Sequence, residues 1–442
     1  MPSTNEQTIS QKMWLIPLLY FAGAVILSVI TAFIDFNVSR VNMHEMFLTK
    51  TDTARAIHSS LVRGILTMTT ITFSVTMVVL TTYTSQYSPR ALQDFLSETF
   101  TQHVLGVFSA GVIVSLFNML TLPDKEKVFL SPVIGVLAGT VALGYFLAFI
   151  NHAANWLKVN KLIERITLET VSCIQTELEP AGAPSPSPWE KWELDDLQEQ
   201  ERFLVRAKKS GYIKTIDVEY LKNLSHQDNT VLRLEADIGD YIDKGMPILS
   251  YWNFPPVQLQ KTSYLEAYNV GSERTQEQDI RFGIQKLSDI AVKSLSSGAS
   301  DPATAIESIK RIGTVLAVLG QHEPRKAHIF DEHKQLRIIR NPIQFEGYLH
   351  LALYQIRHHI KGDVSVMSAV IDALYSAASV NGTAVKTAIW EYFSCMLEVF
   401  DIKKIGSYER EFLTGKIDKL KAVCLFDKTF HKLPETEQGN EE

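Results

Sequence analysis

The stretch that decides the fold is residues 64–90, GILTMTTITFSVTMVVLTTYTSQYSPR. Between Gly64 and Tyr83 the only ionisable side chain is that of Tyr83 itself. A helix needs about 20 mainly apolar residues to cross a lipid bilayer, and this stretch supplies them. The same stretch is rich in hydroxyl groups. We therefore predict a membrane-crossing helix with one distinct polar side.

The hydroxyl-bearing side chains fall on one face of a helix with about 3.6 residues per turn. We call this face the hydroxyl stripe; it consists of Thr67, Thr70, Ser74, Thr81 and Ser85. A serine or threonine hydroxyl can bond to a carbonyl of the preceding turn, so lipid tolerates it. A stripe of this length nonetheless favours a face turned towards other helices or towards water. Pore lining and helix packing both remain open as its role.

The 442 residues divide into two unlike regions. Residues 1–157 hold four apolar spans, whereas residues 158–442 hold most of the charge. The predicted spans are residues 13–34, 64–84, 104–121 and 129–150. In the fourth span, Gly135 and Gly139 have GxxxG spacing, which is either a close-packing face or chance. The lipid bilayer is therefore an expected partner.

The net charge and the spacing of the cysteines argue against several classes of protein. A formal net charge of −6 provides no basic surplus, so we expect no nucleic-acid partner. The three cysteines show no CxxC spacing, which fits a reducing compartment and argues against a disulfide framework or a zinc site. Because the number of predicted spans is even, both termini are expected on one side of the membrane. The large region after the spans shows no pattern of disulfide cysteines, so we expect that side to be the cytoplasm. Lys and Arg residues are nearly balanced across the two sides, so charge bias does not settle the orientation.

The region after the spans changes its periodicity twice. We predict an amphipathic helix and a Pro-rich linker in residues 158–200, a small β-domain in 201–260, a helical cytoplasmic domain in 261–430 and a disordered tail in 431–442. The turn GDYIDKGMP at 239–247 resembles that of lipoyl-type carrier barrels. No lysine stands at the carrier position, so we expect no attached cofactor.

The predicted fold class is thus an α-helical integral membrane protein with four transmembrane helices, followed by a small β-domain and an all-α soluble domain. The densest polar stretch of the soluble part is residues 271–305. It supplies a candidate ligand-binding or structural cluster: Arg274, Asp279, Asp289 and Asp301. Thr275 is expected to cap a helix with Gln278, and Asp301 is expected to cap the next one. Asp279 and Asp289 are nearly three helical turns apart, too far for a catalytic carboxylate pair.

Enzyme signatures are missing from the sequence. It contains no GxSxG, P-loop, GxGxxG or HExxH motif, so we expect no enzyme, no catalytic residue, no metal and no cofactor. His358 and His359 are adjacent and point to different sides of a helix. His322, His328 and His333 lie in a charged loop without the spacing of metal ligands, so solvated positions are expected.

Three stretches carry a resemblance to known proteins: residues 72–96, 210–217 and 271–305. They resemble a bacterial family of predicted inner-membrane proteins catalogued as domain of unknown function 2254. The last stretch departs from the family pattern at Gln276, where the family has proline, and in SSGASDP at 296–302. The resemblance implies several membrane helices followed by a cytoplasmic region, in the bacterial inner membrane. It implies no activity.

Two functions follow as hypotheses. The first is a homo-oligomeric ion channel or transport protein, with the hydroxyl stripe lining a path for ions and the soluble domains regulating it. Four spans rarely enclose a conduit alone, so this hypothesis requires assembly of several copies. The alternative is a membrane-anchored sensor or scaffold whose soluble domains bind a ligand or a partner. A membrane-surface enzyme ranks last because no motif supports it.

Overall fold

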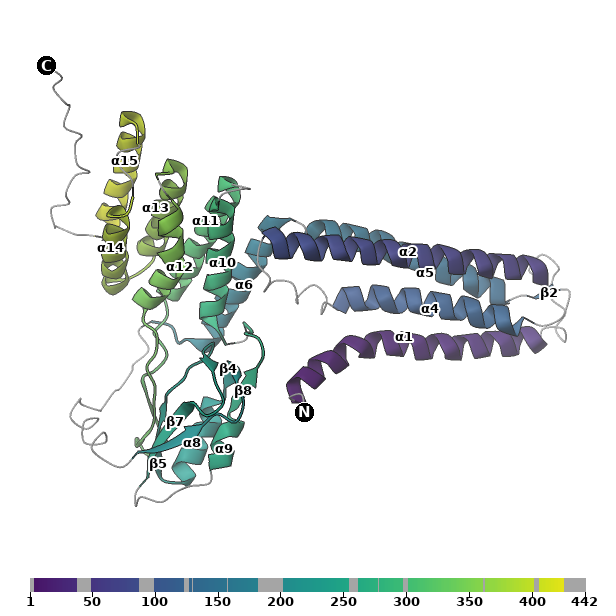
Figure 1. Cartoon of the computed structure of the whole chain (residues 1–442), viewed down its shortest axis with the longest axis horizontal. Coiled ribbons are helices and arrows are strands. Elements are labelled where there is room, and N and C mark those ends of the chain that lie inside the picture. The colour runs from purple at the N-terminus through teal and green to yellow at the C-terminus, as the bar shows by residue number, and fades with distance from the viewer. Residues whose placement is uncertain are drawn as a thin grey trace. The chain divides into compact units, whose positions relative to one another are not determined.

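The computed structural model of the chain describes residues 4–37, 49–86, 99–122, 127–128, 130–156, 158–181, 202–253, 261–276, 278–296, 301–360, 362–400 and 405–424. Most of the predicted Pro-rich linker and the whole of the predicted tail, residues 431–442, lie outside these ranges. The chain forms two compact units, Met1–Lys161 and Leu162–Glu442, which we call the N-terminal and C-terminal units. Figure 1 labels their elements.

The N-terminal unit contains four helices that are long and apolar enough to cross a membrane. They are α1 (Thr4–Asn37), α2 (Thr51–Gln86), α4 (Thr99–Thr121) and α5 (Leu130–Trp156). The predicted number of spans is confirmed by length and composition. Each helix extends beyond its predicted span at one or both ends. The largest extension is in α2, because residues 51–63 continue the same helix.

Helix α4 contacts α1, α2 and α5 and is the most buried of the four (Figure 1). Two of its glycines allow close approach: Gly106 lies against Tyr20 of α1, and Gly111 lies against Ile65 of α2. The short strand β1 (Thr49–Lys50) pairs antiparallel with β2 (Lys127–Val128). This pairing brings the start of α2 beside the segment that follows α4, so the two helices run antiparallel.

The GxxxG pair of α5 is a packing face. A Cβ atom at Gly135 would lie 2.7 Å from Cε1 of His58, and one at Gly139 would meet Leu61. Both partners lie on α2, one helical turn apart. The glycines therefore let α5 approach α2, which resolves the alternative left open by the sequence.

The C-terminal unit contains two sheets. The larger has the order β3 (Phe203–Arg206), β7 (Pro247–Asn253), β5 (Thr230–Leu234), β10 (Leu336–Ile339), β9 (His328–Phe330), and the smaller has the order β6 (Tyr241–Ile242), β4 (Gly211–Ile216), β8 (Tyr268–Gly271). Only the β5–β10 pair is parallel among these strands. The β region also contains two helices, α8 (Val218–Gln227) and α9 (Lys261–Glu266).

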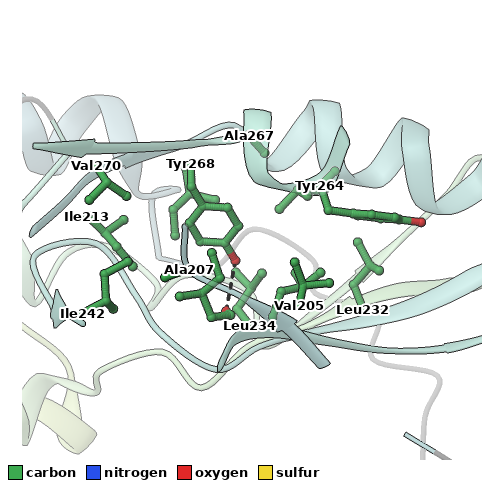
Figure 2. Close-up of a cluster of buried hydrophobic side chains, with 14 of the residues drawn as sticks. Val205, Ala207, Ile213, Leu232, Leu234, Ile242, Tyr264, Ala267, Tyr268 and Val270 are labelled. Carbon is green, nitrogen blue, oxygen red and sulfur yellow. Dashed lines mark hydrogen bonds between the residues drawn. The ribbon is translucent and has the colours of Figure 1, made fainter. Parts of the chain in front are cut away.

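Side chains from both sheets share one core, shown in Figure 2. Ile213 and Val270 come from the smaller sheet, and Leu232 and Leu234 come from the larger one. Tyr268 is buried among them and donates its hydroxyl to the carbonyl of Ile248 at 3.3 Å. The polar end of the ring is thus satisfied inside an apolar core.

The β region is larger than the predicted residues 201–260. Strands β8, β9 and β10 come from the range 261–430, so this range is not all-α as predicted. These strands are three or four residues long, too short for a periodic pattern to appear in the sequence. β8 pairs with β4 and β10 pairs with β5, which lie far away in the sequence, whereas β9 pairs with the neighbouring β10. Tertiary context of this kind overrides local strand preference.

The other helices of this unit follow the predicted periodicity closely. They are α6 (Val159–Glu177), α10 (Ile280–Leu295), α11 (Pro302–Leu319), α12 (Phe345–His359), α13 (Val364–Ser379), α14 (Thr383–Leu397) and α15 (Ser407–Cys424). Helices α10 to α15 lie side by side in Figure 1. At the contact of α11 with α13, Gly313 lies against the backbone of Ala373.

Asp331 holds the turn between β9 and β10. Its carboxylate accepts hydrogen bonds from the Gln335 amide (2.9 Å), from Arg337 Nε (2.8 Å) and from His226 Nδ1 (2.9 Å). Burial raises the pKa of the Asp331 carboxyl, but these hydrogen bonds outweigh burial and hold the pKa well below its ordinary value. Arg337 is itself buried, so the two charges depend on each other.

The α2–α5 contact predicts that Gly135→Val destabilises the N-terminal unit. The added methyl groups meet the His58 ring, and overpacking of this kind costs about 1–3 kcal/mol. Gly144→Val is the matched control, because a Cβ at Gly144 meets nothing within 4 Å. We expect a melting temperature in detergent lower by about 5 °C for Gly135→Val than for the control. Equal melting temperatures would contradict the packing role.

The Asp331 network predicts that Asp331→Asn destabilises the C-terminal unit by about 3 kcal/mol at pH 7, because Arg337 loses its charged partner. The stabilisation by the wild-type carboxylate is present above its unfolded pKa of about 4 and is lost as the pH falls below that value. Urea unfolding from neutral to acid pH should therefore show the two proteins converging in acid. Asp372→Asn, which removes a partly exposed pair with Lys416, should cost less than about 1 kcal/mol. A difference that persists unchanged in acid would refute the assignment.

Candidate functional site

The hydroxyl stripe lies on the exposed face of α2. Thr67, Thr70, Ser74 and Thr81 are exposed in the single chain, and the side chain of Ser85 lies outside the described residues. Each of these four hydroxyls donates to a carbonyl of the preceding turn, at 2.9–3.0 Å. The stripe therefore does not face the interior of its own four helices. Whether it lines a pore in an assembly of several copies stays a prediction.

A different polar group lies inside the N-terminal unit. Asp35 of α1 accepts the first backbone N–H groups of α5, from Leu130 and Ser131, both at 2.8 Å. It thereby caps α5 from another helix, where a negative charge is favoured. Ser131 Oγ lies 2.8 Å from Nε2 of His58 on α2. All three polar side chains are less than 4 % exposed.

Asn118 of α4 lies at the level of this group. Ile65 of α2 lies against Gly111 of α4, and the two helices run antiparallel. Seven residues, about two turns, separate Ile65 from His58 and Gly111 from Asn118. The four helices thus each place one buried polar side chain near one end of the bundle. We call Asp35, His58, Asn118 and Ser131 the polar layer.

The polar layer is incompletely paired. Among the described residues, His58 Nδ1 and both amide atoms of Asn118 have no hydrogen-bond partner. Ser115, one turn from Asn118 on α4, and Thr72 of α2 also have buried hydroxyls without a partner there. An unpaired buried polar atom costs about 1–3 kcal/mol. An imidazole nitrogen, an amide oxygen and hydroxyl oxygens are groups that pair with water or with a small cation.

In the C-terminal unit, the structure brings two of the four candidate cluster residues together. Arg274 donates Nη2 and Nε to one oxygen of Asp279, at 2.6 and 2.9 Å. The other oxygen of Asp279 accepts the backbone N–H of Phe282 at 3.0 Å and caps α10. Asp279, not Thr275 as predicted, is therefore the N-cap, because the buried pair with Arg274 fixes the start of the helix.

Asp289 and Asp301 lie elsewhere. Asp289 is ten residues further along α10 than Asp279, which is about 15 Å along the helix axis. Asp301 caps α11 as predicted, accepting from the N–H and the hydroxyl of Thr304 at 3.2 and 2.6 Å. These hydrogen bonds lower the pKa of the Asp301 carboxyl. The four residues therefore do not form one ligand site.

The start of α10 instead joins the β region to the helices. Arg281 donates to Asp240 at 2.9 Å and to the carbonyl of Ile238, which lie in the turn after β5. Gln278 accepts the N–H of Ile216 of β4 at 3.1 Å. Gln276 donates to Thr170 of α6 at 2.8 Å. Of the four cluster residues, Arg274 and Asp279 thus belong to a structural junction.

The functional candidates that sequence reasoning missed are the polar layer and the basic side chains after α11. His58, Asn118 and Asp35 were detectable as polar groups within or beside apolar spans, which is itself a functional signal. His328, expected to be solvated, instead lies partly buried on β9. Burial lowers the pKa of its imidazole. Arg325 is also largely buried, bonded to the Gln278 carbonyl at 2.7 Å and to Glu177 at 3.2 Å.

The junction predicts a requirement for glycine at position 239. Gly239 has a φ of +85°, and a Cβ there would overlap the Asp279 carboxylate and lie 2.8 Å from Arg274 Nη2. Gly239→Ala should therefore displace the buried pair and lower the free energy of unfolding by about 3 kcal/mol. Gly245→Ala is the matched control, because Gly245 has a φ of +92° and open space around it. Urea unfolding measures both, and equal losses would show that backbone strain alone accounts for the effect.

Comparisons with known proteins agree with the membrane-length helices. An uncharacterized protein of Mycobacterium bovis and one of Mycobacterium tuberculosis are each 26% identical to this chain over 320 residues. The matches cover 70% of this chain, which spans only 60% of the length of each relative. No solved structure matches the chain. A family model described as predicted membrane protein (DUF2254) matches residues 10–376. The chain therefore belongs to this family of predicted membrane proteins, DUF2254, as the resemblance of residues 72–96, 210–217 and 271–305 implied.

Proposed function

We propose that the protein is a homo-oligomeric ion channel or transport protein of the bacterial inner membrane, with both termini in the cytoplasm. The observation that carries the proposal is the incompletely paired polar layer inside helices of membrane length. Polar side chains that face the interior of a membrane bundle are costly and are typical of ion and proton pathways. The membrane relatives give no activity of their own, so the proposal rests on the side chains.

The chemistry of the layer favours a small cation or a proton as the transported species. His58 offers Nδ1, and Asn118 offers an amide oxygen, while Ser131 already holds the other side of the His58 ring. A water molecule or a cation at either side chain would satisfy atoms that otherwise lose hydrogen bonds. Ser115 continues this polar surface one turn along α4. The proposed route for the ion is a hydrated path along α4.

The hydroxyl stripe supports assembly. Its exposed hydroxyls sit on α2 between apolar side chains such as Phe73 and Val78, which are also exposed in the single chain. A second copy packed on this face would bury both kinds of side chain. The proposal therefore places α2 at the contact between copies, where the stripe either packs or borders the path.

The proposal predicts that Asn118→Leu reduces ion flux without destabilising the protein. Leucine fills a similar volume and removes the two unpaired atoms, so the melting temperature should stay the same or rise. Flux of H⁺, Na⁺ and K⁺ into proteoliposomes should fall by about tenfold or more, equivalent to a barrier higher by about 1.4 kcal/mol. Thr140→Val is the control, because this hydroxyl is exposed on α5 and bonds to its own helix.

Two outcomes would count against the proposal. Proteoliposomes of the wild-type chain that carry none of the three cations would remove its basis, as would equal flux in wild type and Asn118→Leu. The oligomer is tested separately by the mass of the protein in mild detergent. A monomer there would refute the assembly, and Thr70→Val with Ser74→Ala should weaken an assembly built on α2.

A membrane-anchored sensor is the second candidate function. It is favoured by a cavity of about 910 Å³ in the C-terminal unit, bounded by charged side chains. In that case the four helices anchor the chain, and the polar layer is a hydrated structural element. Ligand binding without any flux would support the sensor and exclude the channel.

A further inference from the structure

The cavity in the C-terminal unit is bounded by the end of α6, the turn from β4 to α8, strand β9 and the residue after β10. Its volume of about 910 Å³ is within the range of small-molecule sites. The wall includes one histidine, several basic side chains and carboxylates. The basic side chains and the histidine of the wall are Lys222, Arg325, Lys326, Arg340 and His328, and four carboxylates lie in the same wall.

Most of the basic side chains in the wall are already neutralised. Arg325 pairs with Glu177 at 3.2 Å. Lys326 Nζ lies 2.7 Å from Glu179, and Lys222 Nζ lies 2.5 Å from Glu219. Three of the carboxylates in the wall are therefore committed to cations. A fourth, Asp217, accepts the N–H of Tyr220 at 2.9 Å and caps α8.

Arg340 is the exception. It donates Nε to the carbonyl of Lys326 at 2.6 Å, and within the described part of the chain no carboxylate lies within 4 Å of its guanidinium. Burial and the neighbouring Arg325 lower the pKa of Arg340 to about 10, against the opposing effect of Asp237 and Glu177. The guanidinium stays charged at neutral pH. A charge withdrawn from water in this way lacks a close counter-ion of its own.

The surroundings of Arg340 fit an oxyanion. A guanidinium presents parallel N–H donors that match two oxygens of a phosphate or carboxylate. His328 also borders the cavity, and burial lowers the pKa of its imidazole. A neutral imidazole offers one N–H donor to a ligand. The adjacent Arg325 is paired with Glu177, so within the wall the guanidinium of Arg340 is the group that an oxyanion would pair with.

We propose that this cavity binds a phosphate-bearing small molecule, with the phosphate on Arg340 and His328 and the rest of the molecule in the remaining volume. This site lies in the C-terminal unit and requires neither the polar layer nor ion flux. Binding is therefore measured independently of transport, and either proposal can fail without the other.

The test uses the full chain in a phosphate-free maltoside detergent, titrated with pyrophosphate and followed by melting temperature and calorimetry. We expect saturable stabilisation of the wild type. Arg340→Gln should bind pyrophosphate about tenfold or more weakly, the scale of a lost charge-assisted pair of hydrogen bonds. Arg311→Gln, which removes an arginine paired with Glu307 on α11 away from the cavity, should bind as the wild type does.

A second variant keeps the test decisive if Arg340→Gln does not fold. His328→Gln removes one donor from the wall and should weaken pyrophosphate binding by several-fold while leaving Arg340 in place. Absence of binding to the wild type, or equal binding by wild type, Arg340→Gln and His328→Gln, would overturn the proposal. Saturable binding of malonate but not pyrophosphate would overturn the phosphate assignment. Binding of phosphatidic acid in the micelle but not of pyrophosphate would assign the site to a lipid headgroup and overturn the small-molecule proposal.

Discussion

The architecture of the C-terminal unit depends on one buried carboxylate, that of Asp279. Burying a carboxylate is costly, and the cost is offset only when its oxygens receive charged or backbone donors. Arg274 and the Phe282 N–H supply these donors, which fixes where α10 begins. The pair also lies so close to the turn after β5 that only glycine fits at position 239. The turn after β5 and the start of α10 therefore meet at this ion pair.

The N-terminal unit uses a buried carboxylate in the same way but with a different outcome. Asp35 is satisfied by two backbone N–H groups of α5, as Asp279 is satisfied by Arg274 and the start of α10. Its neighbours are not: His58 and Asn118 retain polar atoms without partners among the described residues. A buried network in which every polar atom is hydrogen-bonded is accounted for by its structural role. A network with unpaired polar atoms requires a further hydrogen-bond partner. This contrast separates the junction at Asp279 from the polar layer as a candidate site.

The sequence predicted those features that depend on neighbours in the chain. Apolar spans and helical periodicity are local, so the four long helices and α10 to α15 were predictable, and Asp301 was recognisable as a cap. Strands β9 and β10 were missed because each is short and becomes a strand through pairing, β10 with the distant β5 and β9 with β10. Thr275 was preferred to Asp279 as a cap because the competing ion pair with Arg274 was invisible to a local pattern. The proposed site at Arg340 is lined by segments far apart in the sequence and has no local signature.

The polar side chains on the outer and inner sides of α2 differ in their hydrogen bonding. On the outer side, Thr70 and Ser74 donate to carbonyls of their own helix, so these hydroxyls are satisfied in lipid as well as in a protein contact. On the inner side, Thr72 and His58 are buried and keep atoms that have no partner in the described part of the chain. The outer stripe carries the more conspicuous set of hydroxyl groups. The inner side, however, carries the polar atoms that have no hydrogen-bond partner among the described residues. If water or ions enter these helices, the energetic reason lies with His58 and Asn118 rather than with the more conspicuous stripe.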